Sequence, residues 1–234
     1  QMTHNSLFYT DENLEPQPCL VESYEIVSDT EWVFKLKQGV KFHNGQEVKA
    51  ADVKASLELC KESPQVSQYG TSSGTIEVVD DYTIKMTTDG PQSGLLSDLC
   101  HHGNAILPAD LIASGHDFNK EPIGTGPYKF VAWNKGESIE LEANEDYWGE
   151  VPAIKHVIWK IIPEGSSRTM ALEAGEVDMI IEVESTDLSR LQDNPDIVTV
   201  NEPGTGHNWV MINNEKAPFD NVDFRRAIDA AVDK

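Results

Sequence analysis

The chain has 234 residues, with 40 acidic side chains against 18 basic ones and a formal charge of −22. This length suffices for one or two domains with a full hydrophobic core. The charge excludes nucleic acids and anionic membrane surfaces as partners, and no apolar run reaches the roughly 20 residues of a membrane-spanning helix.

Alternating polar and apolar residues predict three β-hairpins in the first two thirds of the chain. Their strands cover residues 22–27 and 32–37, 75–79 and 82–87, and 128–133 and 138–143. Val53, Leu57 and Cys60 stand at helical spacing and predict a helix over residues 50–62. The glycine-rich residues 124–127 lead into a strand, so they predict a tight turn, because a phosphate-binding loop would open a helix.

The last third predicts alternating strands and helices. A strand at residues 157–162 leads to a helix at 166–174 that Gly175 ends. Further strands are predicted at 178–183, 197–200 and 209–212, with a short helix near Leu188. Residues 222–234 predict a helix capped by Asp220 or Asn221. These patterns predict an α/β chain with an antiparallel-rich insert.

The cysteines and two adjacent histidines are the candidate metal ligands of the sequence. Cys19, Cys60 and Cys100 form neither a zinc motif nor a disulfide framework, so buried, inert thiols are favoured, and one bridge plus one thiol stays open. His101 and His102 beside Cys100 would suit nickel, copper or zinc. Adjacent residues rarely direct their side chains at one ion, so polar residues at a helix end are favoured. We predict no metal site and no cofactor.

The sequence shows no catalytic constellation. It contains no GxxxxGK[ST] phosphate loop, no GxSxG elbow and no HExxH helix. The acidic side chains are scattered, which is typical of a solvated surface. We therefore predict no catalytic residues.

Seven segments carry, in order, the motifs of one known family. Residues 14–24 are similar to an L-x-P-x-L-A-E-S-W opening, and residues 32–45 follow W-x-F-x-L-R-x-G-V-K-F-H-D-G almost position for position. The other segments lie at residues 51–53, 124–128, 144–149, 174–178 and 213–234. Together they resemble the extracellular solute-binding proteins of family 5, the oligopeptide, dipeptide and nickel receptors of ABC importers.

The resemblance implies an α/β fold like that of periplasmic binding proteins of the class II type. Residues 1–30 would start the first lobe, 31–160 would form an inserted subdomain of antiparallel hairpins, and 161–234 would complete a mixed sheet up to the interlobe crossing. The second lobe would be absent from this chain, which we expect to expose a strand edge or an apolar patch.

The resemblance also implies a function without catalysis. Such a receptor captures a peptide or a similar small solute between two lobes and delivers it to the permease subunits of an ABC transporter. It would work outside the cytoplasm as a monomer, in the periplasm or on the cell surface as a lipoprotein. Its only tie to the membrane would be a lipid anchor upstream of this chain.

Five residues are candidate ligand contacts. Tyr69 resembles an aromatic contact of the peptide-binding relatives. His207, Asn208 and Trp209 resemble the family's crossing segment, where Trp209 would offer a flat wall and the other two would offer hydrogen bonds. Core packing is the alternative for Trp209. Glu184, between a strand and a helix, would receive a ligand ammonium, or it is a solvated loop carboxylate.

The aromatic residues within the family motifs are expected to be structural. Large rings on hairpins bury much area, so these side chains identify the fold and not the site. They are Trp32, Phe34, Tyr128, Tyr147 and Trp148.

Two alternatives are kept beside the peptide receptor. His101, His102 and His207 motivate a receptor for nickel, a nickel chelate or haem. The polar residues 182–185 motivate a peptide hydrolase, but they lack a base at a recognisable spacing. The absence of repeats disfavours a structural or adhesive protein.

Overall fold

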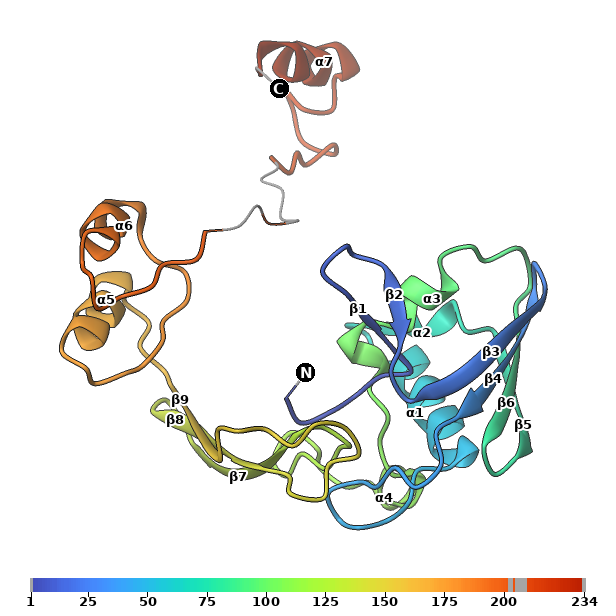
Figure 1. Ribbon diagram of the computed structural model, residues 1–234. Helices are drawn as coiled ribbons and strands as arrows, with labels where there is room; N and C mark the ends of the chain where they lie inside the picture. Colours follow the sequence, from blue (N-terminus) through green and yellow to red (C-terminus); the bar gives the residue numbers. More distant parts are fainter. Residues whose placement is uncertain (1, 202–203, 205–209, 233–234) are drawn as a thin grey trace. The chain divides into compact units, whose positions relative to one another are not determined.

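The computed structural model describes residues 2–201, 204 and 210–232. The chain forms two compact units, unit 1 (Gln1–Pro163) and unit 2 (Glu164–Lys234) (Figure 1). The domain boundaries expected after residues 30 and 160 stay predictions. None of the helices in the described ranges combines the length and the apolar character that crossing a membrane requires.

The strands of unit 1 pair antiparallel, and the three predicted hairpins are confirmed. A two-stranded sheet joins β1 (Phe8–Thr10) to β2 (Pro16–Pro18). The four-stranded sheet has the order β3 (Val21–Ser28), β4 (Glu31–Leu36), β6 (Thr83–Thr87) and β5 (Thr75–Asp80). The three-stranded sheet has the order β7 (Tyr128–Asn134), β8 (Ser138–Ala143) and β9 (His156–Lys160).

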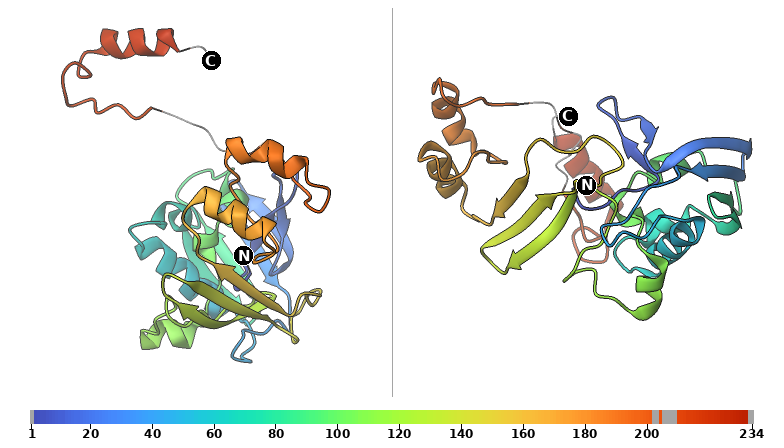
Figure 2. Two further views of the ribbon diagram at one scale, coloured as in Figure 1. Left: turned by 90° about the vertical axis from the view of Figure 1, so that its left-hand side faces the viewer. Right: turned by 60° about the horizontal axis from the view of Figure 1, so that its bottom comes forward.

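The predicted helix of unit 1 is confirmed as α1 (Ala50–Glu62), which packs against the four-stranded sheet (Figure 2). The Asp52 carboxylate accepts the backbone N–H of Lys49 at 2.8 Å and that of Ala109 at 2.8 Å. It thereby joins the start of α1 to that of α4 (Ala109–Ser114). The sequence does not predict α4 or three shorter helices, because so few residues show no helical period. These are α2 (Ser67–Thr71), α3 (Leu95–Asp98) and the 3-10 helix η1 (His102–Asn104).

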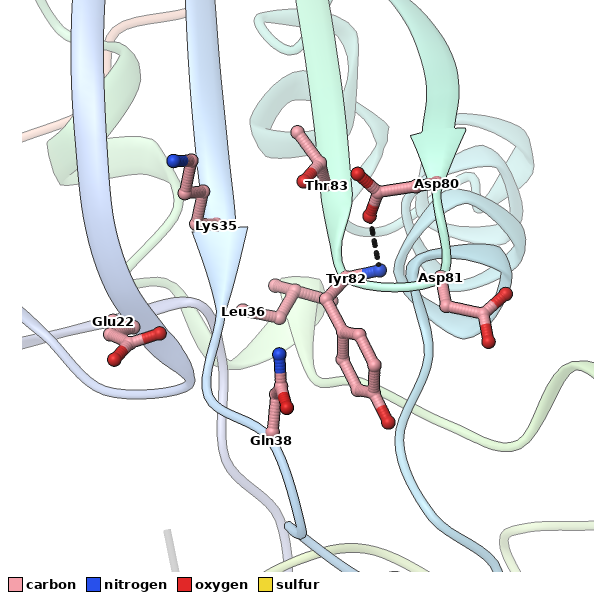
Figure 3. Close-up of a pocket in the computed structure, with 8 residues that line it drawn as sticks. All are labelled: Glu22, Lys35, Leu36, Gln38, Asp80, Asp81, Tyr82 and Thr83. Carbon is pink, nitrogen blue, oxygen red and sulfur yellow. Dashed lines mark hydrogen bonds between the residues drawn. The ribbon is translucent and has the colours of Figure 1, made fainter.

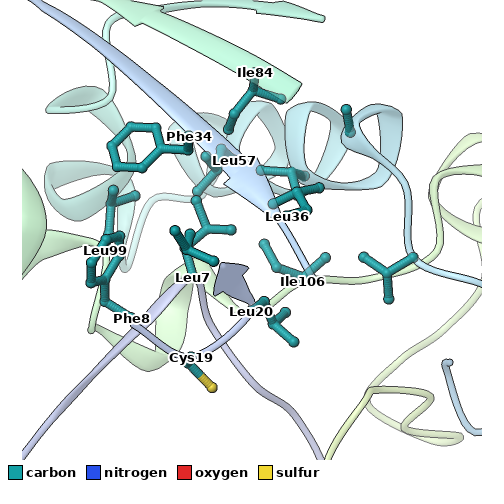
Figure 4. Packing of buried hydrophobic residues seen from close by; sticks show 14 of the residues in the cluster. Leu7, Phe8, Cys19, Leu20, Phe34, Leu36, Leu57, Ile84, Leu99 and Ile106 are labelled. Carbon is teal, nitrogen blue, oxygen red and sulfur yellow. The ribbon is translucent and has the colours of Figure 1, made fainter. Parts of the chain in front are cut away.

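The core of unit 1 is built from the apolar faces of the four-stranded sheet, α1 and β1 (Figure 4). Phe34 of β4 is fully buried. Its ring meets Phe8 edge-on with 5.9 Å between centroids and stacks on Tyr24 at 6.1 Å. Trp32 is also buried, so the structural role predicted for these two motif residues is confirmed.

The other three motif aromatics lie half-buried at the edge of the core. The Tyr128 hydroxyl donates to the carbonyl of Ile154 at 3.1 Å, and Trp148 Nε1 donates to that of Thr125 at 3.2 Å. Tyr147 packs against Trp148 with 5.2 Å between ring centroids. Tyr128 and Trp148 therefore anchor loops through hydrogen bonds, and Tyr147 adds apolar packing against Trp148.

The three cysteines are buried and no disulfide joins them, as the sequence favours. Burial raises the pKa of the Cys19 thiol to about 11. Because the thiolate is the reactive form, such a thiol is inert at neutral pH.

Residues 2–6 run beside the glycine turn of residues 124–127. The N–H of Gly126 donates to the carbonyl of Thr3 at 3.0 Å, and that of Tyr128 donates to Met2 at 3.0 Å. A Cβ on Gly126 would lie 2.4 Å from the carbonyl oxygen of Met2, so only glycine fits here. The turn leads directly into β7, which confirms its predicted role.

The three-stranded sheet has one apolar face. Trp133, Ile139 and Trp159 stand side by side in register across β7, β8 and β9. The two tryptophan side chains keep 45% and 40% of their area exposed. An exposed apolar patch is therefore present, as expected.

We expect the 234-residue chain to self-associate through this patch, and to do so more strongly at high ionic strength, because salt screens its charge of −22. Replacing Trp133 and Trp159 with threonine should weaken association at least about tenfold, measured by sedimentation equilibrium. Ile154→Thr, at a side chain 65% exposed outside the strands, is the matched control. Equal weakening by this control would place the contact elsewhere.

Unit 2 confirms the predicted helices as α5 (Gly165–Glu173), α6 (Ser185–Gln192) and α7 (Val222–Ala231). The Asn221 side chain caps α7 by accepting the N–H of Asp223 at 2.8 Å. The strands predicted at 178–183 and 197–200 are wrong, as is the part of 209–212 that the structure describes. In the described part of unit 2 no strand ladder provides partners for their backbone groups.

Candidate functional site

A polar groove of about 600 Å³ opens where β3, β4 and β6 meet the β5–β6 turn (Figure 3). It is lined by Glu22, Lys35, Leu36, Gln38, Asp80, Asp81, Tyr82 and Thr83. A second groove of about 480 Å³ shares Glu22 and Gln38 and reaches Trp148. The lining carries charges of both signs, with acidic side chains in the majority in the first groove, and neither groove contains a predicted ligand contact.

Tyr69 belongs to a stack of three aromatic rings in unit 1. Its ring lies on that of His101 with 3.5 Å between centroids and 13° between planes. The His101 ring lies 4.0 Å from that of His102, tilted by 35°. Tyr69 and His101 are half-buried, and His102 is exposed. We call these three residues the ring ladder.

The backbone around the ring ladder is closely packed. A Cβ on Gly70 would lie 2.8 Å from the backbone nitrogen of Lys61 in α1. A Cβ on Gly103 would lie 2.8 Å from the Cβ of Val66. The fully buried Asn104 donates through Nδ2 to the carbonyls of Tyr69 at 3.1 Å and Asp98 at 2.8 Å. η1 is thus joined to α2 by the Asn104 side chain and by the close approach of Gly103 to Val66, as well as by the rings.

His101 is held in its neutral form. Its Nδ1 accepts the N–H of Gly103 at 3.0 Å, so this nitrogen carries no proton. Burial, and then the neighbouring His102, lower the pKa of His101. The middle of the ladder is therefore an uncharged imidazole at neutral pH.

The structure does not bring Cys100 to these histidines as a third metal ligand. The buried Cys100 thiol donates to the carbonyl of Leu96 at 3.3 Å. Across the described residues, no group of three or more histidine, cysteine, aspartate and glutamate side chains is placed to hold a metal ion.

Glu184 precedes α6 in unit 2 and lies against the start of α5. A Cβ on Gly165 would be 2.5 Å from its Oε1. The positive end of a helix dipole stabilises a carboxylate there. The preceding Glu182 is left-handed at φ 55°, and its carbonyl accepts a hydrogen bond from Arg168 at 3.0 Å. The ligand contact predicted for Glu184 stays a prediction. A ligand ammonium at this carboxylate would share it with the start of α5.

The three remaining predicted contacts, His207, Asn208 and Trp209, lie outside the described residues and stay predictions. Sequence reasoning missed the place of His101 and His102 beside Tyr69. The adjacent histidines were visible, but the packing of α2 against η1 that brings Tyr69 to them leaves no periodic signal.

Three known proteins show how far the likeness extends. The glutathione-binding protein GsiB of Pectobacterium atrosepticum is 30% identical over 237 residues, covering 99% of this chain and 46% of its own length. The structure of DppA from Helicobacter pylori in complex with the peptide STSA matches with a TM-score of 0.88 and 31% identity. That match covers 99% of this chain and 51% of DppA.

NikZ from Campylobacter jejuni, in complex with Ni(L-His), matches with a TM-score of 0.88 and 27% identity, over 99% of this chain and 48% of NikZ. The predicted α/β fold like that of periplasmic binding proteins is thereby confirmed, and the chain spans about half the length of these relatives. The profile of the bacterial extracellular solute-binding proteins, family 5, matches residues 15–234. The chain therefore belongs to this family of solute-binding proteins.

Proposed function

We propose that this chain is part of the solute-binding component of an ABC importer. The component captures peptides or similar small solutes outside the cytoplasm and delivers them to the permease. The observation that carries this proposal is the match along 99% of the chain to a receptor in complex with a peptide. Tyr69 in unit 1 and Glu184 in unit 2 are the described residues proposed to contact the solute.

The proposed role is binding without catalysis. Two of the polar residues 182–185 have structural roles, because Glu184 lies against Gly165 and Ser185 is the first residue of α6. A nucleophile needs a positioned base, which these contacts do not supply. Incubation of the receptor with a labelled peptide library should yield no cleavage, and turnover that Glu184→Ala abolishes would overturn this assignment.

We expect the 234-residue chain to fold but to bind peptides far more weakly than a receptor of the relatives' full length. One wall of a two-lobed site leaves a ligand largely hydrated, so the contacts and desolvation of closure are lost. Calorimetric titration of both proteins with the same tetrapeptide pool checks this. Equal affinities would show that residues 1–234 contain the whole site.

Nickel or a nickel chelate is the second candidate ligand. It is favoured by the exposed imidazole of His102 and by the match to NikZ in complex with Ni(L-His). Titration with Ni²⁺, with and without histidine, beside the peptide pools separates the candidates. Tight nickel binding without any peptide response would replace the peptide proposal.

A further inference from the structure

We propose that the ring ladder is a stacking platform, on which the outer face of His102 receives a planar ring of the captured solute. The receptor would then prefer peptides that carry an aromatic side chain. This inference rests on the proposed function and specifies the ligand class of the same protein.

The geometry leaves one end of the ladder open. Two rings with centroids 3.5 Å and 4.0 Å from that of His101 would overlap if they lay on the same face of it. Tyr69 and His102 therefore cover opposite faces, and His101 lies between them. Tyr69 is half-buried while His102 is exposed, so the end of the ladder at His102 is the more accessible one for a further ring.

The platform is fixed before any ligand arrives. The backbone beside His102 cannot move towards α2, because Gly103 already touches Val66. The Ser6 hydroxyl holds the carbonyl of His101 at 3.2 Å, and the buried Asn104 joins η1 to α2. A surface that is already ordered loses little conformational entropy on binding.

The chemistry favours ring stacking over coordination. The neutral His101 and the Tyr69 ring present π faces, and offset stacking of such rings stabilises beyond the area they bury. Nickel sites need several donors, and within the described ranges no third histidine, cysteine or carboxylate joins His101 and His102. The open imidazole face is thus best matched by another planar ring.

The experiment compares two tetrapeptide pools on the receptor at its full length. The pools are identical except that one carries Trp, Tyr or Phe where the other carries Leu, Ile or Val. Calorimetry is performed on the wild type, His102→Leu and His102→Phe. His156→Leu, at an exposed histidine of β9, is the matched control.

We expect the wild type to bind the aromatic pool roughly threefold to tenfold more tightly than the aliphatic pool. His102→Leu should make the receptor bind the two pools equally tightly, whereas His102→Phe and His156→Leu should keep the preference. A preference that survives His102→Leu, or that His102→Phe also abolishes, overturns the platform. Equal binding of both pools by the wild type overturns the platform alone, whereas binding of neither pool overturns the peptide receptor as well.

Discussion

Replacing Phe34 with alanine should lower the free energy of unfolding by about 3–5 kcal/mol. The side chain is fully buried at the middle of the four-stranded sheet, between β3 and β6. Its removal takes away contacts with the rings of Phe8 and Tyr24 and leaves a cavity that flanking strands cannot close. Urea denaturation followed by circular dichroism measures the change.

Ile26→Ala is the matched control for this substitution. Ile26 lies in the neighbouring strand β3, but its side chain is 58% exposed. We expect its removal to cost well under about 1 kcal/mol, because little apolar area leaves contact with the core. A loss for Phe34→Ala as small as that of the control would mean that the core in Figure 4 does not hold the sheet together.

Acidification should destabilise the chain between pH 6.5 and about 4, well before most carboxylates are protonated. Burial, and then the neighbouring His43, lower the pKa of His4 from 6.5 to about 4. In this window the unfolded chain binds more protons than the folded one, so stability falls as the pH falls. The stabilisation that comes from keeping His4 neutral in the folded chain is complete above pH 6.5 and lost below about pH 4. His4 alone should contribute about 2–3 kcal/mol to this loss.

The contacts of His43 give the acid effect a structural cause. Its Nε2 donates to the carbonyl of Gly126 at 3.0 Å, and its Nδ1 accepts the N–H of Gly124 at 3.4 Å. Burial lowers the pKa of His43 as well. A second proton on His43 would remove the acceptor at Nδ1, and protonation of His4 as well would leave two neighbouring rings with positive charges that repel each other.

Urea unfolding from about pH 7.5 down to about pH 4.5 tests this account. His4→Gln should flatten the dependence of stability on pH, even if its stability at neutral pH is lower. His156→Gln, at an exposed position of β9, should keep the wild-type slope. An unchanged slope in His4→Gln would show that other groups govern the acid response.

The sequence predicts best where the pattern is local. The hairpin strands and α1 carry a period of two or of about 3.6 residues, and the structure places them within a residue or two of the prediction. The strands predicted at 178–183 and 197–200 fail because apolar alternation shows only that a segment can pair. A strand also needs a neighbour for its backbone groups.

The candidate site is less predictable than the fold, because it depends on contacts between distant segments. Tyr69 follows from the family resemblance, but its stacking on His101 depends on Gly70 letting α2 approach α1 and on Gly103 letting η1 approach Val66 at the start of α2. Glu184 is visible as a carboxylate between two elements, whereas its contact with the first turn of α5 is a tertiary feature. No sequence period encodes either contact.

Close packing beneath the ring ladder constrains the backbone at Gly103 but leaves the neighbouring side chain of His102 exposed. Gly103 is confined by Val66, so a change there would disturb α2 and the core behind it. The side chain of residue 102 is exposed and lies against the ring of His101, with 4.0 Å between the ring centroids. Under the proposed stacking platform, single substitutions at this position retune which solutes are retained while the scaffold stays intact, which makes it the natural first position to randomise when designing receptors with new selectivity.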